Sequence, residues 1–266
     1  MSTDDDLVLQ PKGPADAPGG AIVRAAVVVV AAGSSTRMQR SADGVRKPQM
    51  LLEGVPILER TCAVFDAIPD VHEIILVAHP DDVATYEQWT LEKPALDKVR
   101  AIVPGGKQRA DSVRAGVFWC GFDVQVIAVH DAARPLVRPE TVQQALRTAQ
   151  REGAALVAVP VTDTLKEADI PKEAGVRAVR TVDRRKLWSA QTPQVFDAMA
   201  LRELVKDAAE EGFTPTDDSA LWERAHGPVP LVRGESTNLK ITTPTDLEIA
   251  AAILRMRAQG EAEANS

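Results

Sequence analysis

The sequence has few cysteines and no excess of positive charge. Among 266 residues it has two cysteines, Cys62 and Cys120, and its formal net charge is −7. Two thiols without the spacing of metal ligands indicate no zinc site and favour a reducing compartment. An acidic chain is a poor scaffold for nucleic acid, so we expect no nucleic-acid partner and only local roles for basic residues.

Long hydrophobic segments are also missing. No apolar run of the sequence reaches the ~20 residues that a membrane-spanning helix needs. The first residues, MSTDDD, are acidic, whereas a signal peptide begins with basic residues. We therefore expect a soluble, cytoplasmic protein without a membrane partner.

Two familiar phosphate-binding loops are absent. The segment VVVVAAGSSTRM, residues 27–38, has one glycine and lacks the GxGxxG fingerprint. The Gly-Lys pair in PGGKQR, residues 104–109, lacks the earlier glycine and the hydroxyl of a Walker loop. A valine run that ends at Gly33, with Arg37 and Lys47 nearby, still suits a phosphate chain, because ligands of parallel sheets bind beyond the carboxyl ends of strands. Taken alone, VVVVAAG fits a buried first strand and its turn equally well.

Strand and helix patterns alternate from Ala25 onward. Strand-like runs lie at residues 27–30, 73–79, 99–105, 124–131, 154–161 and 228–234, and helical patterns lie at 56–68, 81–89, 110–120, 139–153, 195–212, 219–227 and 243–259. This alternation predicts an α/β fold, a mostly parallel sheet with helices on both faces. We predict a disordered tail at 1–24, one domain at 25–258 and a frayed end at 259–266.

The alternation breaks after Val161. Residues 162–186 are polar and charged, with too little apolar surface to pack alone, so they predict a protruding hairpin or arm. Further on, NLKIT at 238–242 predicts a short strand that places Lys240 between apolar neighbours. Its ammonium needs an anion or water there, and simple solvation on an edge strand is the alternative.

Two segments carry groups suited to a nucleotide. VHDAARPLV, residues 129–137, ends an apolar run at Asp131, where a carboxylate suits Mg²⁺ or, alternatively, caps a helix. Arg134 adds a forked anion ligand, and His130 is expected to be a packed residue without a catalytic role. In PGGKQRADSV, residues 104–113, the glycines permit close approach to a ring or phosphate, or simply a tight turn. Ser112 is either a base-reading hydroxyl or a first-turn residue.

The order of motifs resembles one family. AAGxxxRM, KxxxL, GGxxRxxSV, VHDAARP, DTxK, TVDR, TPQ, TDD and NxKIT follow one another from about Ala25 to Arg257. This order is similar to that of the 2-C-methyl-D-erythritol 4-phosphate cytidylyltransferases. The resemblance implies a Rossmann-like nucleotidyltransferase fold of the GT-A type, with a mixed, mostly parallel sheet and a protruding β-arm. It also implies cytidylyl transfer from CTP in the non-mevalonate isoprenoid pathway.

Two alternatives stay open beside this resemblance. Several of the motifs also occur in related cytidylyltransferases, so another polyol phosphate such as ribitol 5-phosphate is an alternative acceptor. An inactive nucleotide-binding or interaction protein on the same fold is the alternative from another class. The sequence contains the three cations Arg37, Lys47 and Lys240 together with the acid Asp131. This combination favours an enzyme, because nucleotide binding alone needs fewer cations.

The resemblance also assigns roles to residues. The catalytic cations would be Arg37, Lys47 and Lys240. The CTP-binding residues would be Ala31, Ala32, Gly33, Gly106, Ser112, Asp131 and Ala132. The acceptor would be held by Arg134, Thr164, Arg184, Thr192 and Thr216. Asp131 would also bind Mg²⁺, and the arm would form a homodimer. Family members often read Pro-Lys-Gln around the loop lysine, whereas this chain reads Arg46-Lys47-Pro48-Gln49, which makes Arg46 a second candidate.

Overall fold

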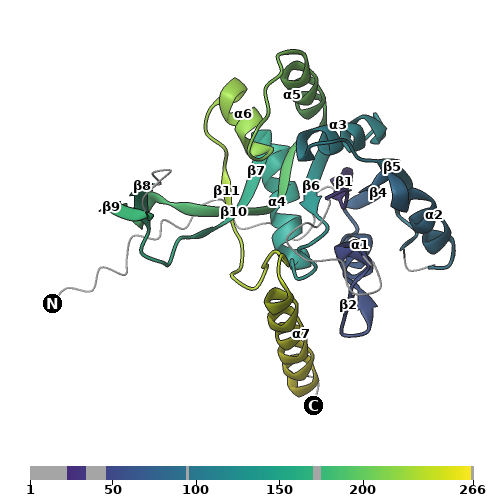
Figure 1. Cartoon of the computed structure of the whole chain (residues 1–266). Helices are drawn as coiled ribbons and strands as arrows, with labels where there is room; N and C mark the ends of the chain where they lie inside the picture. Colours follow the sequence, from purple (N-terminus) through teal and green to yellow (C-terminus); the bar gives the residue numbers. More distant parts are fainter. Residues whose placement is uncertain (1–22, 34–45, 94–95, 170–174, 265–266) are drawn as a thin grey trace.

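Apolar runs form a seven-stranded sheet at the centre of the molecule (Figure 1). The structure, a computed structural model, describes residues 23–33, 46–93, 96–169 and 175–264. The strands of this sheet are β1 (Ala25–Val30), β4 (Val71–Ala78), β5 (Val99–Pro104), β6 (Val126–Asp131), β7 (Ala154–Pro160), β10 (Trp188–Asp197) and β11 (Leu231–Arg233). Their spatial order is β11-β7-β10-β6-β1-β4-β5.

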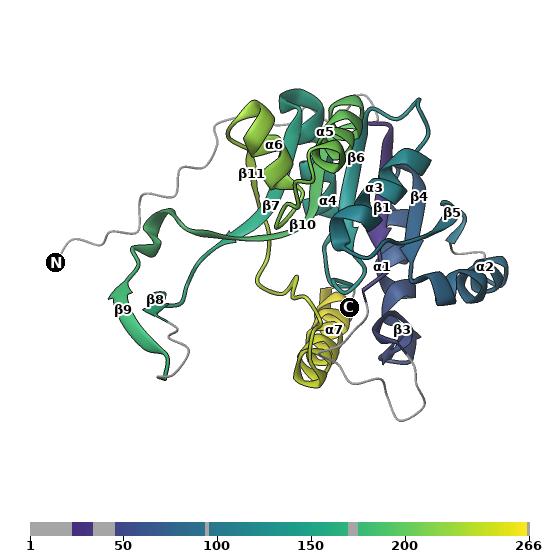
Figure 2. The same ribbon diagram turned by 45° about the horizontal axis from the view of Figure 1, so that its top comes forward.

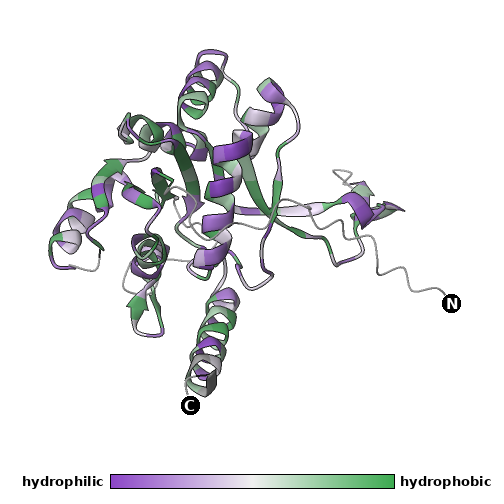
Figure 3. Ribbon diagram, turned by 180° about the vertical axis from the view of Figure 1, so that it is seen from behind, coloured by the Kyte–Doolittle hydropathy of each residue, from purple (hydrophilic) through white to green (hydrophobic). Residues whose placement is uncertain are grey.

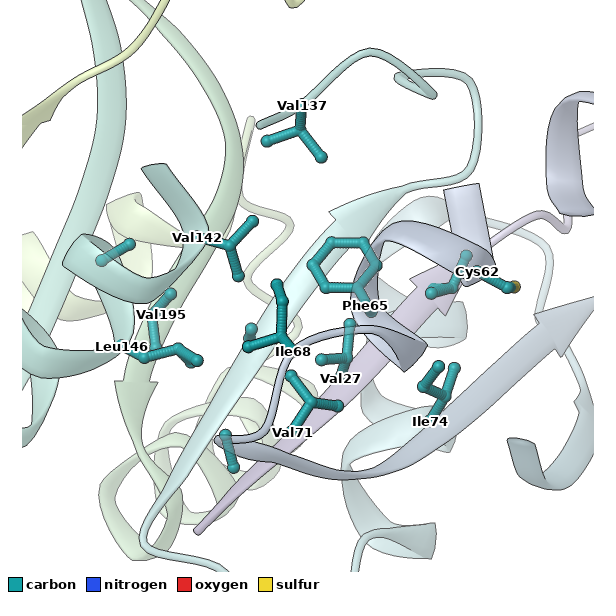
Figure 4. Close-up of a cluster of buried hydrophobic side chains, with 14 of the residues drawn as sticks. Val27, Cys62, Phe65, Ile68, Val71, Ile74, Val137, Val142, Leu146 and Val195 are labelled. Carbon is teal, nitrogen blue, oxygen red and sulfur yellow. The ribbon is translucent and has the colours of Figure 1, made fainter. Parts of the chain in front are cut away.

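Helices cover both faces of the sheet, as predicted. One face carries α1 (Ile57–Asp66), α2 (Val83–Leu91) and α4 (Pro139–Glu152), and the other carries α3 (Arg109–Trp119), α5 (Ala198–Glu210) and α6 (Ser219–His226). Val27 of β1 packs with Phe65 of α1 in one buried cluster (Figure 4), while Val28 packs with Val117 of α3 in the other. Burial on both faces explains why the inner strands, such as β1 and β7, are almost continuously hydrophobic, and hydrophobic residues predominate at the centre of the sheet (Figure 3).

The chain order creates a switch point between β1 and β6. From β1 the chain proceeds through β4 and β5 on one side, and then returns to β6 on the other side of β1. Both neighbours run parallel to β1, and Val30 lies in register with Asp131. Ligands of open α/β sheets bind where the strand order reverses in this way. The fold thus places Asp131 at the expected crevice.

Strand β10 departs from the sequence-based prediction, which begins a helix at Val195 and has no strand directly before it. The strand lies between β6 and β7 and is antiparallel to both. Val195 and Phe196 are fully buried on opposite faces of the sheet, so their period is that of a strand. Helix α5 begins only at Ala198, after the Asp197 carboxylate accepts the N–H groups of Met199 and Ala200.

The segment 238–242 is a loop, so the predicted strand there is wrong. Its backbone groups bond to the turn after β6: Asn238 O accepts from Arg134 Nη1 at 2.7 Å, and Ile241 N–H donates to Ala133 O at 2.8 Å.

The ends of the folded region also differ from the predicted boundaries. Val23 is fully buried before the predicted boundary at 25, and α7 (Pro244–Ala264) continues beyond 258.

Short elements complete the fold. A small hairpin, β2 (Leu51–Leu52) and β3 (Val55–Pro56), lies beside α7. The predicted arm contains the antiparallel pair β8 (Lys166–Asp169) and β9 (Arg177–Thr181), which projects from the body (Figure 2). Single turns of 3₁₀-helix occur at η1 (Lys47–Gln49), η2 (Pro80–Asp82) and η4 (Arg184–Lys186). Within the described residues, no helix is long and apolar enough to cross a membrane.

Gly116 allows α3 to lie close to the sheet. A Cβ atom at this position would lie 2.4 Å from Val28 Cγ1 and 2.8 Å from Val77 Cγ2. Gly116→Ala is therefore expected to lower the free energy of unfolding in urea by about 1–3 kcal/mol. Gly260→Ala, also in a helix but with no atom within 4 Å of the new Cβ, should leave stability unchanged or raise it slightly. Equal stability of the two variants would contradict this close packing.

Candidate active site

A cavity of about 610 Å³ lies beyond the carboxyl ends of β1 and β6. Its walls come from the turns after these two strands, the loop between β5 and α3, η1, η2 and the loop before α7. All seven predicted CTP-binding residues line it: Ala31, Ala32, Gly33, Gly106, Ser112, Asp131 and Ala132. Lys47 and Lys240 line it as well. The structure therefore gathers the predicted nucleotide residues around one space.

The predicted acceptor residues are more dispersed. Arg134 and Thr192 lie next to Asp131, whereas Thr164 and Arg184 are exposed at the arm. Thr216 is exposed in the loop before α6. Of these five residues, none lines the cavity. The third predicted catalytic cation, Arg37, lies outside the described residues.

The loop between β5 and α3 presents backbone to the cavity. A Cβ on Gly105 would lie 2.2 Å from Ala32 Cβ, so a glycine is required where this loop meets the turn after β1. Ser112 Oγ accepts the Gly106 N–H at 3.1 Å and donates to Gln108 O at 3.2 Å. Its hydroxyl therefore holds the loop in shape, in the first turn of α3.

Asp131 is surrounded by cations. Its Oδ2 lies 2.7 Å from Lys240 Nζ, its Oδ1 lies 3.3 Å from Arg109 Nε, and Arg134 Nε lies 4.0 Å away. Burial alone would raise the pKa of Asp131, but Arg109 and Lys240 outweigh burial and hold this pKa well below its usual range. The carboxylate is therefore charged at neutral pH, and Lys240 has the anion partner that its apolar neighbours require.

Lys47 and Arg46 point to different surroundings. The Arg46 guanidinium pairs with Asp81 at 2.7 Å and with Asp82 at 3.1 Å, beside η2. Arg46 does not line the cavity, whereas Lys47 does. Of the two candidates in this loop, Lys47 is thus the one placed to meet a ligand.

Known proteins are similar to this chain in sequence. The family model for 2-C-methyl-D-erythritol 4-phosphate cytidylyltransferase matches residues 25–256. The chain belongs to this family. A member from Caldanaerobacter subterraneus is 42% identical over 228 residues, which cover 86% of this chain and 97% of the relative. One from Symbiobacterium thermophilum is 41% identical, covering 91% of this chain and 97% of the relative.

Solved structures of the family have the same fold. The crystal structure of 2-C-methyl-D-erythritol 4-phosphate cytidylyltransferase from Thermus thermophilus has a TM-score of 0.68 and 32% identity, covering 88% of this chain and 99% of that one. The 4-diphosphocytidyl-2C-methyl-D-erythritol synthase of Anaerococcus prevotii has a TM-score of 0.74 and 27% identity, covering 88% of this chain and 96% of that one. The Rossmann-like fold predicted from the family resemblance is confirmed.

A buried hydrogen-bond relay supports the turn after β6. The Asp131 N–H donates to Thr192 Oγ1 at 3.1 Å. The Thr192 hydroxyl donates to His130 Nδ1 at 3.0 Å, because the other ring nitrogen faces the Arg134 backbone oxygen, which can only accept. His130 is then protonated on Nε2, which donates to Arg134 O at 3.1 Å. Burial lowers the pKa of His130 to about 4, so its ring is neutral. His130 is packed as predicted, and the Thr192 hydroxyl is occupied in holding Asp131.

Sequence reasoning assigned no role to three residues of this site. Arg109 forms two bonds to the buried Asp218, from Nη1 to Oδ1 at 3.0 Å and from Nη2 to Oδ2 at 2.8 Å. Asn238 Nδ2 donates to Thr192 O at 3.0 Å. Arg109 and Asp218 belong to the motifs GGxxRxxSV and TDD, but they are 109 positions apart, and no local pattern shows their pairing.

A divalent cation fits this site only in company with a nucleotide. Among the described residues that line the cavity, Asp131 is the only acid, and no cluster of three metal-ligating side chains occurs in the described parts of the chain. Mg²⁺ commonly binds one or two carboxylates together with substrate phosphates and waters. The donor set therefore fits an ion carried largely by phosphates and does not fit an all-protein site.

Acid should destabilise the fold through His130. Its pKa is about 4 in the folded protein and about 6.5 in an unfolded chain, so between these values the unfolded state binds more protons. The stability due to the neutral ring is complete above pH ~6.5 and is lost as the pH falls toward ~4. Between pH 7 and 5 the loss should reach roughly 2 kcal/mol.

Urea unfolding at both pH values measures this effect. His130→Gln should lose less stability on acidification than the wild type. His72→Gln replaces an exposed histidine and should keep the wild-type difference. If His130→Gln and the wild type lost equal stability, protonation of His130 would not be the cause.

Proposed function

We propose that this chain transfers the cytidylyl group of CTP to 2-C-methyl-D-erythritol 4-phosphate and releases pyrophosphate. The observation that carries this proposal is the cavity at the switch point between β1 and β6. Small residues and backbone form one wall, while Lys47 and Lys240 bring positive charge to the same space. The identity of the acceptor in this proposal is taken from the activity for which the relatives are named.

The reaction needs positioned charge more than acid–base groups. An oxygen of the acceptor phosphate attacks the α-phosphorus of CTP, a new P–O bond forms, and the bond to the leaving pyrophosphate breaks in line. A phosphate monoester is already ionised near neutral pH, so no general base is required. Lys47 and Lys240 serve as catalytic cations that stabilise the developing charge. Arg37 is assigned the same role on its motif alone.

The base is recognised chiefly by backbone. Ala31, Ala32 and Gly33 follow β1, and Gly106 faces the same cavity. Fixed N–H and C=O groups in these turns distinguish a pyrimidine edge by hydrogen bonding. Ser112 and Ala132 complete this wall of the cavity.

Asp131 would hold Mg²⁺ together with the nucleotide phosphates. When bound, the ion supplies positive charge to the triphosphate and orients it. The fit rests on Asp131, the one acid among the described residues of the cavity wall, and on its depressed pKa, which keeps an oxygen donor charged at neutral pH.

The acceptor phosphate would meet Arg134 first. Arg134 lies beside the cavity, with its Nε 4.0 Å from Asp131 Oδ2, and its guanidinium is a forked donor suited to a phosphate. Thr164, Arg184 and Thr216 would complete acceptor binding, and Thr192 would contribute by holding the turn that carries Asp131 and Arg134. Of these, Arg184 and Thr164 belong to the arm and not to the cavity wall.

The arm supports a homodimer. All described residues of β8 and β9 are exposed, and Val176 and Val179 are 66% and 64% exposed. A two-stranded projection is marginal in water and needs a surface to pack against. A two-fold dimer would provide that surface and would bring Arg184 to the partner's site.

The two buried cysteines, Cys62 and Cys120, suit a cytoplasmic location. Burial raises the pKa of each thiol to about 12.

Pyrophosphate release tests the proposed reaction. With CTP and 2-C-methyl-D-erythritol 4-phosphate we expect turnover, and kcat/KM with UTP should be at least ~10-fold lower, because a mismatched buried group loses about 1–3 kcal/mol. Ribitol 5-phosphate is the control acceptor. Faster turnover with it would reassign the acceptor, and CTP binding without turnover with either acceptor would indicate a nucleotide-binding protein.

Mixed dimers test whether Arg184 acts across the interface. Arg184→Ala and Lys240→Ala should each be nearly inactive, since loss of one preorganised charge costs about 10²–10³ in kcat. When the two variants exchange subunits, one site of each mixed dimer holds both Arg184 and Lys240, so part of the activity should return. Demonstrated exchange without recovered activity would contradict action of Arg184 in the partner's site.

A further inference from the structure

Two cations contact Asp131 in different ways. Lys240 makes one contact, from Nζ to Oδ2 at 2.7 Å, and its side chain is 40% exposed. Arg109 reaches Oδ1 with Nε at 3.3 Å while its two terminal nitrogens bind Asp218. Lys240 is thus held at one point, whereas Arg109 is held on two sides.

Asp218 fixes the orientation of Arg109. Two parallel N–H···O bonds set the plane of a guanidinium group, which a single ammonium contact cannot do. The Asp218 side chain is only 2% exposed, so a rotation of Arg109 would leave a buried carboxylate without its counter-charge. Arg109 is therefore a fixed neighbour of Asp131, and Lys240 is the neighbour that can move.

Capping of α6 does not account for Asp218. Although Asp218 stands at the N-cap position, its side chain makes no capping bond. Asp217 does this instead, because its Oδ1 accepts from Ser219 Oγ at 3.0 Å and from the Ala220 N–H at 3.1 Å. The hydrogen bonds of the Asp218 carboxylate in the described structure go to Arg109.

We propose that Arg109, anchored by Asp218, is a positioning residue that holds Asp131 while Lys240 exchanges partners. Lys240 leaves Oδ2 for the nucleotide phosphates, and the vacated oxygen becomes available to the divalent cation. Arg109 keeps Oδ1 in place throughout, so the carboxylate does not turn away when Lys240 departs. This inference rests on the proposed function, since it concerns the same nucleotide site.

The proposal predicts that loss of the Asp218 charge changes the Mg²⁺ dependence of CTP binding and does not weaken CTP binding in the absence of metal. Without the Asp218 charge, Arg109 is free to turn fully toward Asp131 and compete with the cation for it. The same unbalanced cation adds positive charge beside the triphosphate, so metal-free nucleotide binding should not weaken. A merely structural lesion would instead weaken CTP binding by the same factor with and without metal.

Calorimetric titration of CTP without acceptor, in EDTA and across a MgCl₂ series, tests this. For Asp218→Asn, the MgCl₂ concentration that gives half-maximal enhancement of binding should rise about 5- to 20-fold. Its Kd for CTP in EDTA should stay equal or fall, and kcat at saturating MgCl₂ should recover toward the wild-type value. Asp217→Asn, the matched neighbour that does not contact Arg109, should stay within about 2-fold of the wild type in both titrations.

A second variant covers the case in which Asp218→Asn fails to fold, as judged by circular dichroism. Arg109→Lys keeps the charge but lacks the two-sided fork, and it should raise the MgCl₂ requirement in the same way. The proposal is overturned if the folded variant matches Asp217→Asn, or if both titrations weaken by one common factor. Absence of CTP binding by the wild type at every MgCl₂ concentration would overturn the proposed function itself.

Discussion

A charged carboxylate at the end of a fully buried strand constrains the whole site. Every residue of β6 is buried, and Asp131 closes the strand. A charge in that position is costly unless other charges and donors surround it. Arg109, at the start of α3, and Lys240, in the loop before α7, provide them. One buried charge thus draws the start of α3 and the segment before α7 to the end of β6, where the cavity lies.

The antiparallel strand β10 serves the same carboxylate. It places Thr192 beside β6, so that the Thr192 hydroxyl can accept the Asp131 N–H and donate to His130. Asn238 then binds Thr192 O and fastens the Lys240 loop to this strand. The reversal of direction at β10 is therefore part of the site's support. It joins the turn that carries Asp131 to the loop that carries Lys240.

Sequence patterns predicted those parts of the molecule whose signal is local. The valine run of β1 reads as a strand because both of its faces are buried, and the small residues after it mark the crevice. In β10, by contrast, Val195 and Phe196 follow TPQ and precede a helical run, so local periodicity favours a helix, and only pairing with β6 and β7 decides otherwise. NLKIT alternates as a strand would, yet Arg134 and Ala133 take its backbone bonds. Arg109 and Asp218 carry no local signal of their pairing at all.

The same reasoning explains why the nucleotide residues converge in one chain, whereas the predicted acceptor residues of the arm do not join them. Nucleotide binding uses turns at the ends of adjacent strands, and the sheet itself brings those turns together. Thr164 and Arg184 belong to an arm that makes its own two-stranded pairing and stays exposed. The sheet therefore does not bring Thr164 and Arg184 to the cavity of their own chain. In the proposed dimer the second copy would supply the arm residues, so their part of acceptor binding would depend on association, whereas folding of one chain gathers the nucleotide residues.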